Sequence, residues 1–516
     1  MLYIREISNH CEIEGDPQEL EDVLAQVLVQ QRDKEKKVLV LYKEDVQYNS
    51  TSTSSTHRCN SECTLKCTRR IITFPSGLLN FLIREIELRD IDVEVTRLPR
   101  LVILPIPINL LSTDEFPIEL RDYQVTSIRK GVTHRRGIFN IATGGGKTEV
   151  IIGMAKIIGN SLTIVPSKSS LKQTYARFKK RGITDVGRLG GGFGVTTAKH
   201  TVATASVISS RLKSGNKAVK SLLNRVELLM FDEVHHLGTA ASWQRVASAC
   251  PAPRRFGFSG SPWATGMPCI DLGNESESSY ADFKVVREVG ESLVYIPSKM
   301  LREMGVIVDP SIYVVPVNEP KGLMRNPFPQ WRSIYKSGII ENEHRNNLVI
   351  EAAARLTERK HRTAILVVSI PHGTELLKRL YAKNLTAAFT KGDDEVLVYT
   401  GKKIKKISEA GEKYRDAFLD GEIDVLIGSV VIDEAVDLPG MSALILAGGG
   451  KSPIRAVQRI GRAIRTSEGK NEAIVIDFRD RQHFFLNNHT NKRLGIYTAH
   501  AYDYEETEWD ELWKRI

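Results

Sequence analysis

Long apolar runs, cysteines and aromatic residues are all scarce in this chain of 516 residues. No apolar run approaches the about 18 residues that a helix needs to cross a bilayer, and prolines interrupt the most apolar segment, residues 101–111. We therefore expect no membrane association. The opening stretch, MLYIREISNHCEIEGD, also lacks the basic start and apolar centre of a secretory signal. A cytoplasmic protein is expected, located in the host-cell cytoplasm if the chain is viral.

The chain contains 6 cysteines, and a reducing compartment favours free thiols or metal ligands over disulfides. Four residues of the segment 57–67 could ligate zinc, but the gaps of three residues between its cysteines are unusual for a zinc site. A zinc site, reduced thiols in a loop and a disulfide all stay open. The four candidate ligands are His57, Cys59, Cys63 and Cys67, and the remaining cysteines, Cys11, Cys250 and Cys269, are expected to be structural.

Composition places the chain among folded globular proteins. Hydrophobic residues make up 41% and charged residues 26% of the sequence, far from the composition of disordered chains. Its length suggests about three to four domains. The 72 basic residues exceed the 62 acidic residues, which gives a net charge of +10. This surplus favours a polyanionic partner without identifying one.

Residues 1–113 are expected to form a small accessory α/β domain. Residues 17–31 and 76–88 have helical periodicity, whereas 37–42 and 91–98 have the pattern of strands. A loop rich in serine and threonine, residues 49–68, separates these two pairs. We expect this domain to bind DNA or a partner protein.

Two series of strands follow, and each alternates with helical or turn segments. This alternation predicts an α/β protein with parallel sheets and crossover helices. The expected domains are 114–300 and 301–485, followed by a helical tail, 486–516, and residues 265–310 are expected to act as a linker. The first series contains GIFNIA, SLTIVP, TVATA, LLMFD and RFGFSG, and the second contains TAILVVSI, EVLVYTG, DVLIGS, ALILAG and AIVIDF.

A glycine-rich turn joins the first strand of the first series to a helical segment. Glycines let backbone N–H groups approach phosphates, and the N-terminus of the following helix favours negative charge. The pattern therefore predicts a P-loop for a nucleoside triphosphate, although Ile141 replaces the first glycine of the usual motif. Its predicted residues are Thr143, Gly144, Gly145 and Gly146 around the phosphates, Lys147 at the β and γ phosphates, and Thr148 at Mg²⁺.

Two carboxylates end an apolar strand about 85 residues further on, in VELLMFDEVHHLG. We expect this strand to lie beside the P-loop strand. Asp232 is then predicted to bind the Mg²⁺ ion, and Glu233 to orient the attacking water. The neighbouring histidines, His235 and His236, point in different directions and lack a third ligand. We interpret His235 as a polar coupler rather than a zinc ligand.

A second glycine-rich string, LILAGGGKS at 444–452, imitates the first. It lacks the glycine that should stand six positions before Lys451, and Pro453 follows it. We interpret it as a tight turn after a strand rather than as a phosphate-binding loop.

Four further strings complete a known pattern: LRDYQ (120–124), GFSGSP (257–262), GSVVIDEAVDLP (428–439) and QRIGRAIR (458–465). In this order and spacing, the chain resembles superfamily 2 helicases. The resemblance is greatest to the XPB-like branch, which includes the phage UvsW-type branch-migration helicases. It covers about residues 115–480 and implies two tandem RecA-like (P-loop NTPase) domains.

The resemblance also implies roles for individual residues. Ser259 and Ser261 would link hydrolysis to movement on nucleic acid. Arginines from a second domain would neutralise the charge that develops on the γ-phosphate, so that hydrolysis depends on domain closure. The ATP-site residues assigned in this way are Arg121 and Gln124 at the adenine, His235 in the DEVH box, Asp437 at the ribose or an arginine, and Gln458, Arg462 and Arg465, of which the two arginines are the fingers.

Nucleic-acid contacts are expected at the carboxyl ends of parallel strands, where the ligands of α/β sheets collect. Basic clusters at 134–136, 177–181 and 401–406 are either further phosphate contacts or solvated faces. Ala435, Trp263 and Ala264 depart from the family's pattern but remove no charge that contacts ATP. The predicted contacts are Pro166, Ser167, Thr204, Ser369, His372 and Ser429.

The motifs predict a motor that uses ATP and Mg²⁺, and the resemblance implies a helicase that unwinds or remodels branched or forked DNA during replication, recombination or repair. Its substrates would include junctions between single-stranded and double-stranded DNA, and its partners single-strand-binding or recombination proteins. Two other enzymes stay open, an RNA-directed helicase and the motor of a restriction system. An inactive nucleic-acid-binding scaffold is the alternative from another class.

Overall fold

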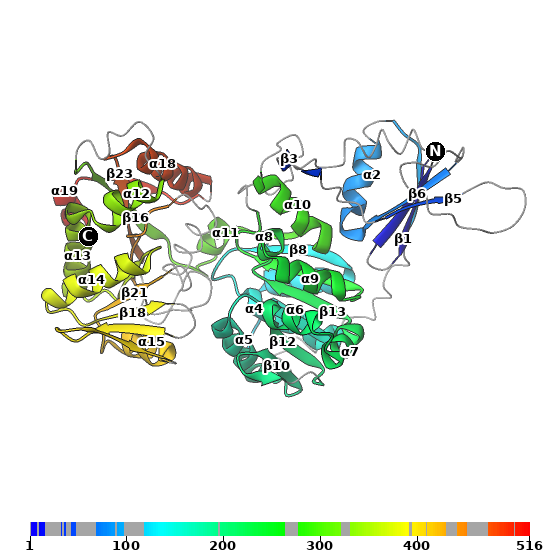
Figure 1. Cartoon of the computed structure of the whole chain (residues 1–516), viewed down its shortest axis with the longest axis horizontal. Helices are drawn as coiled ribbons and strands as arrows, with labels where there is room; N and C mark the ends of the chain where they lie inside the picture. Colours follow the sequence, from blue (N-terminus) through cyan, green and yellow to red (C-terminus); the bar gives the residue numbers. More distant parts are fainter. Residues whose placement is uncertain are drawn as a thin grey trace, which may run out of the picture. The chain divides into compact units, whose positions relative to one another are not determined.

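The structure is a computed structural model, and its described residues form two compact units (Figure 1). The first lies mostly within Met1–Tyr295, and the second contains Ile296–Ile516. The predicted positions at the cysteine loop, at Asp437 and at Gln458, Arg462 and Arg465 lie outside the described residues. Those residues are 2–7, 10–15, 32–33, 36–37, 43–47, 69–87, 90–97, 118–194, 197–263, 277–320, 331–391, 395–408, 410–429, 441–450, 473–499 and 501–516.

A mixed sheet at the N-terminus belongs to the first unit. Its strand order is β5-β6-β2-β1-β7, and the pairs are antiparallel except for β1 with β7. The predicted helix at 76–88 and strand at 91–98 are confirmed, whereas β1, β2, β5 and β6 were not predicted. The predicted helix at 17–31 and most of the predicted strand at 37–42 lie outside the described residues. The elements are β1 (Leu2–Ile7), β2 (His10–Gly15), β5 (Lys43–Gln47), β6 (Arg69–Pro75), η1 (Ser76–Leu78), α2 (Leu79–Glu87) and β7 (Val93–Thr96), with a separate hairpin of β3 (Arg32–Asp33) and β4 (Lys36–Lys37).

The short helix η1, which follows β6, packs closely on helix α10 (Glu277–Val289). A Cβ atom added to Gly77 would lie 2.3 Å from the carbonyl oxygens of Val286 and Arg287, so only glycine permits the approach. An ion pair between Arg84 and Glu291, 3.1 Å between Nη2 and Oε1, lies nearby. The first 97 residues therefore share one unit, and one apolar core, with the sheet that follows.

The main sheet of the first unit has the order β11-β10-β12-β9-β13-β14-β8-β15. All five strands predicted for it are present, and they pair in parallel. The strands are β8 (Arg136–Ile141), β9 (Ser161–Val165), β10 (Val186–Gly190), β11 (Phe193–Gly194), β12 (His200–Thr204), β13 (Leu228–Asp232), β14 (Arg254–Ser259) and β15 (Ser292–Ile296). The helices are α3 (Asp122–Thr133), α4 (Lys147–Ile158), α5 (Lys168–Lys180), α6 (Ala205–Lys213), α7 (Lys217–Arg225), α8 (His236–Thr239) and α9 (Ala241–Ala249).

Two expectations about this sheet are wrong. The carboxylate strand β13 does not lie beside the P-loop strand β8, because β14 pairs with both and separates them. Residues 265–310 are also more than a linker, since they contain α10 and the sheet strand β15. The central position of β14 brings its last residue, Ser259, between the ends of the other two strands.

Apolar strands and close helix packing fix the elements that carry the site. The rings of Phe139 and Phe258 stack with centroids 4.7 Å apart, which joins β8 to β14. Helices α3 and α4 approach through two glycines. A Cβ on Gly131 would lie 2.4 Å from Cε of Met154, and a Cβ on Gly153 would lie 2.4 Å from Cδ1 of Ile128.

The sheet of the second unit has the order β20-β19-β18-β21-β17-β22-β23-β16-β24. Its strands are β16 (Pro310–Val317), β17 (Thr363–Leu366), β18 (Ala387–Lys391), β19 (Glu395–Tyr399), β20 (Ile404–Ile407), β21 (Val425–Gly428), β22 (Ala443–Ile445), β23 (Ala473–Asp480) and β24 (Tyr504–Glu506). The helices are α11 (Ser298–Glu303), α12 (Trp331–Tyr335) with the π-helix η3 (Lys336–Ile340), α13 (Glu343–Glu358), α14 (Ile370–Ala382), α15 (Gly411–Asp420), α18 (Phe484–Ala499) and α19 (Trp509–Arg515).

The second sheet contains a feature that the sequence did not reveal. EVLVYTG, predicted as one strand of the parallel series, is β19, which runs antiparallel to both β18 and β20. The strands β16, β18, β20 and β24 were not predicted, and the predicted terminal helix is α19. Because β24 pairs with β16, the described residues of 486–516 belong to the second unit rather than to a separate tail. No described helix is both long and apolar enough to span a bilayer.

Candidate functional site

The first glycine-rich turn of the chain lies between β8 and α4. Gly144 and Gly146 have φ angles of 88° and 77°, a left-handed conformation that glycine adopts without strain. The N–H of Gly145 donates to the carbonyl of Ala142 at 3.0 Å and closes the turn. Lys147 is the first residue of α4, so the turn ends at a helix N-terminus. Successive backbone N–H groups and a helix N-terminus form a concave site for an anion.

A buried ion pair connects this turn to the carboxylate strand. Lys147 Nζ lies 3.6 Å from Glu233 Oε1, and the two side chains are only 13% and 15% exposed. The structure therefore brings together two residues that are about 85 positions apart in the sequence. An ammonium and a carboxylate at one enclosed point are suited to holding a phosphate and a water molecule.

Glu233 is held by its backbone and by two further side chains. Its φ angle of 59° is unusual for a residue with a side chain, and strain of this kind is concentrated at functional sites. Ser259 Oγ donates to Glu233 Oε2 at 3.0 Å. Ser259 in turn accepts a hydrogen bond from the N–H of Ser261 at 3.1 Å. His235 Nδ1 lies 3.6 Å from Glu233 Oε2 and 3.3 Å from Ser259 Oγ, so it couples the carboxylate to the end of β14.

Burial and nearby charges shift the pKa values of the two carboxylates, Asp232 and Glu233, in opposite directions. Burial, followed by the charge of Glu233, raises the pKa of Asp232. Burial acts in the same direction on Glu233, but the Lys147 ammonium, His235 and the hydrogen bond from Ser259 outweigh it and lower the pKa of Glu233. Glu233 is thus the carboxylate kept ionised by the protein itself. Asp232 needs a further cation to be ionised in the same way.

The residues present fit a magnesium–triphosphate ligand. Thr148 is the second residue of α4 and Asp232 ends β13, so a hydroxyl and a carboxylate, both oxygen ligands of Mg²⁺, come from the two elements that Lys147 and Glu233 join. Ser261 Oγ is buried and has no hydrogen-bond partner among the described residues, which leaves a polar atom for a ligand or water. No group of three or more metal-binding side chains occurs in the described part of the chain.

Two family models match the chain. "Type III restriction enzyme, res subunit" covers residues 117–263, which include the glycine turn, the carboxylates and Ser259. "Helicase conserved C-terminal domain" covers residues 347–467, which include Gln458, Arg462 and Arg465. The chain belongs to the superfamily 2 helicases. This helicase is accordingly an ATP-dependent enzyme with a nucleic-acid substrate.

Curated relatives and solved structures agree with this family. The helicase is 27% identical over 401 residues to "DNA 3'-5' translocase XPB2" of Sulfurisphaera tokodaii, with 72% of this chain and 84% of that protein covered. It is 23% identical to "ATP-dependent DNA helicase uvsW" of Enterobacteria phage T4, with 70% and 69% covered. Its fold is similar to that of Saccharomyces cerevisiae Dbp5 bound to RNA and ADP BeF3, with a TM-score of 0.52, 13% identity, and 78% and 97% of the two chains covered. Two tandem RecA-like domains are thereby confirmed.

The predicted adenine contacts of the helicase lie at the start of α3. The backbone N–H of Arg121 donates to Gln124 Oε1 at 2.9 Å, and the N–H of Gln124 donates to the Arg121 carbonyl at 2.8 Å. Gln124 is only 1% exposed, whereas Arg121 is exposed. The glutamine thus caps its own helix in this structure, and its contact with adenine stays a prediction.

Most predicted nucleic-acid contacts are at carboxyl ends of parallel strands. Pro166 and Ser167 follow β9, Ser369 follows β17, and Ser429 follows β21. The Ser167 hydroxyl caps α5 by accepting from the N–H of Ser170 at 3.0 Å. Ser429 is 7% exposed and donates its own N–H to Thr390. These residues therefore lie at the strand ends where they were expected, while their contact with nucleic acid stays a prediction.

Two further predicted contacts are buried, as Ser429 is. Thr204 is 5% exposed, as the last residue of β12, and His372 is fully buried in α14. His372 Nε2 is hydrogen-bonded to Asn346 Oδ1 at 2.9 Å. Burial, together with the charges of Arg345 and Arg379, lowers the pKa of His372 to about 3. A neutral ring inside the core does not fit the predicted role of a phosphate contact, so His372 is corrected to a core residue.

Two arginines of one basic cluster form ion pairs within the helicase itself. In the cluster 177–181, Arg181 makes two hydrogen bonds to the Glu149 carboxylate, from Nε at 2.8 Å and from Nη2 at 3.0 Å. Arg177 Nε also lies 3.8 Å from Glu149 Oε1. The pair joins the first turn of α4 to the end of α5. In contrast, the lysines of the cluster 401–406 are exposed on the β19–β20 hairpin, although Lys406 pairs with Glu395.

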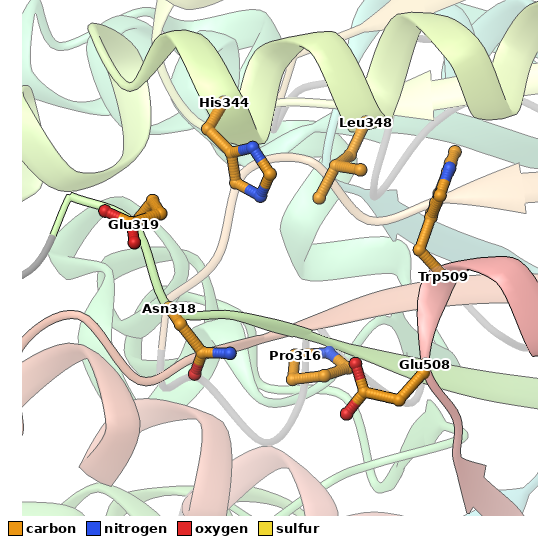
Figure 2. A pocket seen from close by; sticks show the side chains of 7 residues that line it. All are labelled: Pro316, Asn318, Glu319, His344, Leu348, Glu508 and Trp509. Carbon is orange, nitrogen blue, oxygen red and sulfur yellow. The ribbon is translucent and has the colours of Figure 1, made fainter.

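The second unit of the helicase contains a cavity of about 720 Å³ (Figure 2). It lies where β16 ends and where α13 and α19 begin, with Glu319, His344, Glu508 and Trp509 among its lining residues. None of the residues predicted to bind ATP or nucleic acid lines it. We assign no ligand to this cavity.

Proposed function

We propose that this helicase couples hydrolysis of Mg-ATP to translocation along DNA and to the remodelling of branched DNA. The observation that carries the proposal is the enclosed contact of Lys147 with Glu233, which Ser259 and His235 support from β14 and from the DEVH loop. Each of the four side chains has a distinct place at one end of one sheet. Such a constellation suits an active phosphoryl-transfer site better than an inactive scaffold.

Each residue of this site receives one role. The turn from Thr143 to Gly146 directs backbone N–H groups at the phosphates, and Lys147 neutralises charge on them. Thr148 and Asp232 would hold the magnesium ion, which when bound stabilises charge on the β and γ phosphates. The ionised Glu233 accepts a hydrogen bond from the attacking water and aligns it, while Ser259 and His235 keep the carboxylate in position.

The second unit would complete the reaction through the segment that bears Gln458, Arg462 and Arg465. A guanidinium placed at the γ-phosphate contributes about 10³- to 10⁵-fold to hydrolysis in related chemistry. Because these arginines belong to the other unit, hydrolysis would require closure of the two units. Asp437 would contact the ribose or one of the arginines. Repeated closure and opening would then move the protein along the nucleic acid.

DNA is the substrate that the relatives favour. The names of two curated relatives describe a DNA translocase and a DNA helicase. Backbone contacts at Ser167, Ser369 and Ser429 would follow the phosphates without reading bases. Forked and Holliday-junction DNA are the proposed substrates, and single-strand-binding or recombination proteins are the proposed partners.

ATPase assays with different nucleic acids test this proposal. Stimulation of the purified protein is measured with single-stranded DNA, duplex DNA, forked DNA and RNA of matched length. We expect the greatest stimulation with forked DNA, accompanied by unwinding or branch migration of a labelled junction. Greater stimulation by RNA would support the RNA-directed alternative. Absence of stimulation by every nucleic acid would overturn the motor and favour the scaffold.

Zinc binding at the cysteine loop needs a separate measurement. The metal content of protein purified without chelator is compared with that of a Cys63→Ser variant. One zinc per chain, lost in the variant, would establish the site. Less than about a tenth of a zinc per chain would favour thiols or a disulfide at Cys59, Cys63 and Cys67, with no metal at these residues or at His57.

A further inference from the structure

The second glycine-rich string forms a tight turn, Ala447–Gly450, after β22. Gly449 and Gly450 have φ angles of 58° and 96°, in the left-handed region that favours glycine. A Cβ on Gly448 would lie 2.7 Å from the backbone nitrogen of Val368, so the turn presses on the end of β17. The residues that follow in the sequence, 451–472, carry the predicted arginine fingers. The path of this turn therefore sets where that segment starts.

Three side chains from three different helices donate hydrogen bonds to the carbonyl oxygens of this turn. They come from α12, α13 and α18, so elements far apart in the sequence converge on four residues. Backbone carbonyls that are each bound by a directed donor cannot rotate freely. The bonds are Tyr335 Oη to Gly448 O at 2.7 Å, Arg345 Nη1 to Ala447 O at 2.6 Å, and Arg493 Nη1 to Gly450 O at 2.7 Å.

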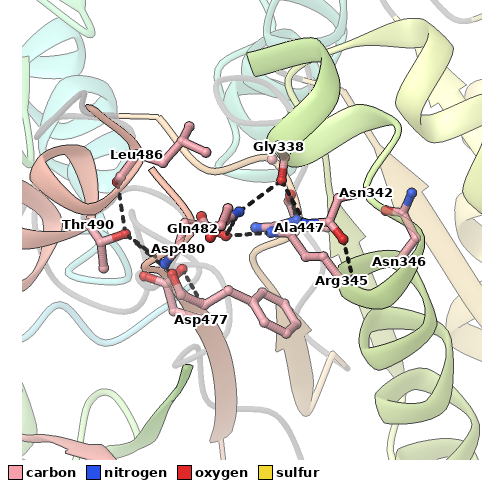
Figure 3. A network of polar contacts seen from close by, with 12 residues as sticks. Gly338, Asn342, Arg345, Asn346, Ala447, Asp477, Asp480, Gln482, Leu486 and Thr490 are labelled. Carbon is pink, nitrogen blue, oxygen red and sulfur yellow. Dashed lines mark hydrogen bonds and ion pairs between the residues drawn. The ribbon is translucent and has the colours of Figure 1, made fainter. Parts of the chain in front are cut away.

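Both guanidinium groups are fixed by aspartates of β23, and Figure 3 shows Arg345, Ala447 and Asp480. Arg345 Nε donates to Asp480 Oδ1 at 2.8 Å, and the side chains are 0% and 2% exposed. Arg493 Nε and Nη2 donate to the two oxygens of Asp477, each at 3.0 Å. The Tyr497 hydroxyl also donates to Asp477 at 2.8 Å. The planar groups are thereby held in one orientation, with a further N–H directed at the turn.

Stability alone does not explain this arrangement. Buried ion pairs often contribute little compared with apolar residues of the same volume, because desolvation offsets their attraction. Arg345 Nη2 is buried and has no acceptor among the described residues, which adds to that cost. Retaining such groups is reasonable when their directionality is needed. Here the two arginines direct their N–H groups at the carbonyl oxygens of the turn.

We propose that Tyr335, Arg345 and Arg493 form a carbonyl clamp that positions the segment bearing Arg462 and Arg465 for ATP hydrolysis. The inference rests on the proposed function, because it needs those arginines to act as fingers. The clamp residues are positioning residues that do not touch ATP. Since a displacement of about 1 Å can reduce turnover by up to about a hundredfold, the clamp acts on kcat more than on KM for ATP.

A variant that lacks a single hydroxyl group distinguishes a role in positioning from a role in folding. Tyr335→Phe deletes the hydrogen bond to Gly448 and leaves the ring in place. Tyr399→Phe is the matched control, because Tyr399 Oη donates to the carbonyl of Gly401 at 2.9 Å in the same unit, on the β19–β20 hairpin. In the full chain we expect Tyr335→Phe to lower the kcat of DNA-stimulated ATPase about five- to tenfold with KM within twofold. The control should change neither.

Combining Tyr335→Phe with the variant Arg465→Ala identifies the group through which the clamp acts. We expect Tyr335→Phe to cause no further loss when Arg465→Ala is already present, as measured by single-turnover hydrolysis of labelled ATP. Arg345→Lys, which keeps the charge but loses the fork, should lower kcat more than Tyr335→Phe. Dependence of the Tyr335 effect on Arg465 is not expected of a merely structural residue.

Three results would overturn the clamp. They are a kcat for Tyr335→Phe within twofold of wild type, an equal loss in Tyr399→Phe, or an undiminished loss in the Arg465→Ala background. Arg465→Ala by itself separates this inference from the proposed function. If that variant hydrolyses ATP at the wild-type rate, the finger assignment fails. If it is inactive while Tyr335→Phe is fully active, only the clamp fails.

Discussion

The two glycine-rich turns of this protein have nearly the same sequence and opposite chemistry. Both are followed by lysine, as TGGGK at 143–147 and AGGGK at 447–451. The first leads directly into a helix, and its lysine reaches the largely enclosed carboxylate of Glu233, which follows β13. At the second, the carbonyl oxygens accept hydrogen bonds from buried cations and a tyrosine. One turn offers donors to an anion, and the other is itself the acceptor.

This difference shows that the surroundings of a turn decide its chemistry. Positive φ angles occur at glycines of both turns, so backbone conformation does not distinguish them. The first is distinguished by Glu233 opposite its lysine and by the start of α4. The second is distinguished by Asp477 and Asp480, which hold two arginines behind it. Substitutions on each side therefore have different expected effects.

The largest expected effect is the difference between replacing Lys147 and replacing Lys451 with alanine. Lys147→Ala removes the ammonium beside Glu233, and we expect DNA-stimulated ATPase to fall about 10³-fold, or ~4 kcal/mol. Lys451→Ala is the matched variant at the second turn, and we expect its rate to stay within about threefold of wild type. Steady-state ATPase at saturating DNA measures both. Equal losses would contradict the distinction between the turns.

Removing one clamp arginine should also destabilise the second unit, in addition to its effect on kcat. Arg493→Met leaves the Asp477 carboxylate buried without its cation, which costs about 3 kcal/mol. The neighbouring Lys492, exposed on the same helix, provides the control Lys492→Met, which should change stability by less than about 0.5 kcal/mol. Denaturant unfolding measures both. Equal midpoints would show that the buried pair does not contribute to folding.

Weakening the support of Glu233 should have a smaller effect than removing Lys147. Ser259→Ala deletes the hydroxyl that donates to Glu233 Oε2 at 3.0 Å. We expect ATPase turnover to fall about tenfold, or ~1.4 kcal/mol, with ATP affinity unchanged. Ser442→Ala is a control in the second unit, where the hydroxyl accepts from the N–H of Arg362. A turnover unchanged in Ser259→Ala would remove β14 from the catalytic site.

The smallest expected effect is a loss of stability on acidification. The folded-state pKa of His372 is lowered to about 3 from its ordinary 6.5, so below pH 6.5 the unfolded chain takes up a proton that the folded chain does not. Stability is therefore unaffected above pH 6.5 and falls as the pH decreases toward 3. From pH 7.5 to 5.5 we expect a loss of about 1 kcal/mol that His372→Asn does not show. Parallel unfolding curves at these two pH values measure it, and an equal loss in both proteins would contradict it.

Much of the first unit was predictable from its sequence. Its five central strands are short apolar runs with clear breaks, and the elements of its site are Gly-rich or acidic strings at strand ends. The order of these strands was not predictable. Residues 254–259 separate the P-loop strand from the carboxylate strand, because parallel strands with crossovers need not be neighbours in the order in which they occur.

The second unit was less predictable because its signals are ambiguous. EVLVYTG has the composition of a buried parallel strand but forms an antiparallel hairpin. His372 follows a strand end, where a ligand contact was expected, yet α14 turns it into the core. Arg345 and Arg493 gave no signal, since isolated arginines are ordinarily exposed. Their role depends on aspartates more than 100 and only 16 residues away, respectively.

The sequence by itself determined the class of this protein, because glycine turns, paired carboxylates and arginine strings act through local backbone geometry and charge. It could not determine how Glu233 comes to lie opposite Lys147. That pairing depends on strand order, on the left-handed backbone of Glu233 and on buried arginine–aspartate pairs. These features join residues distant in the chain, and only the tertiary structure brings their charges to one place.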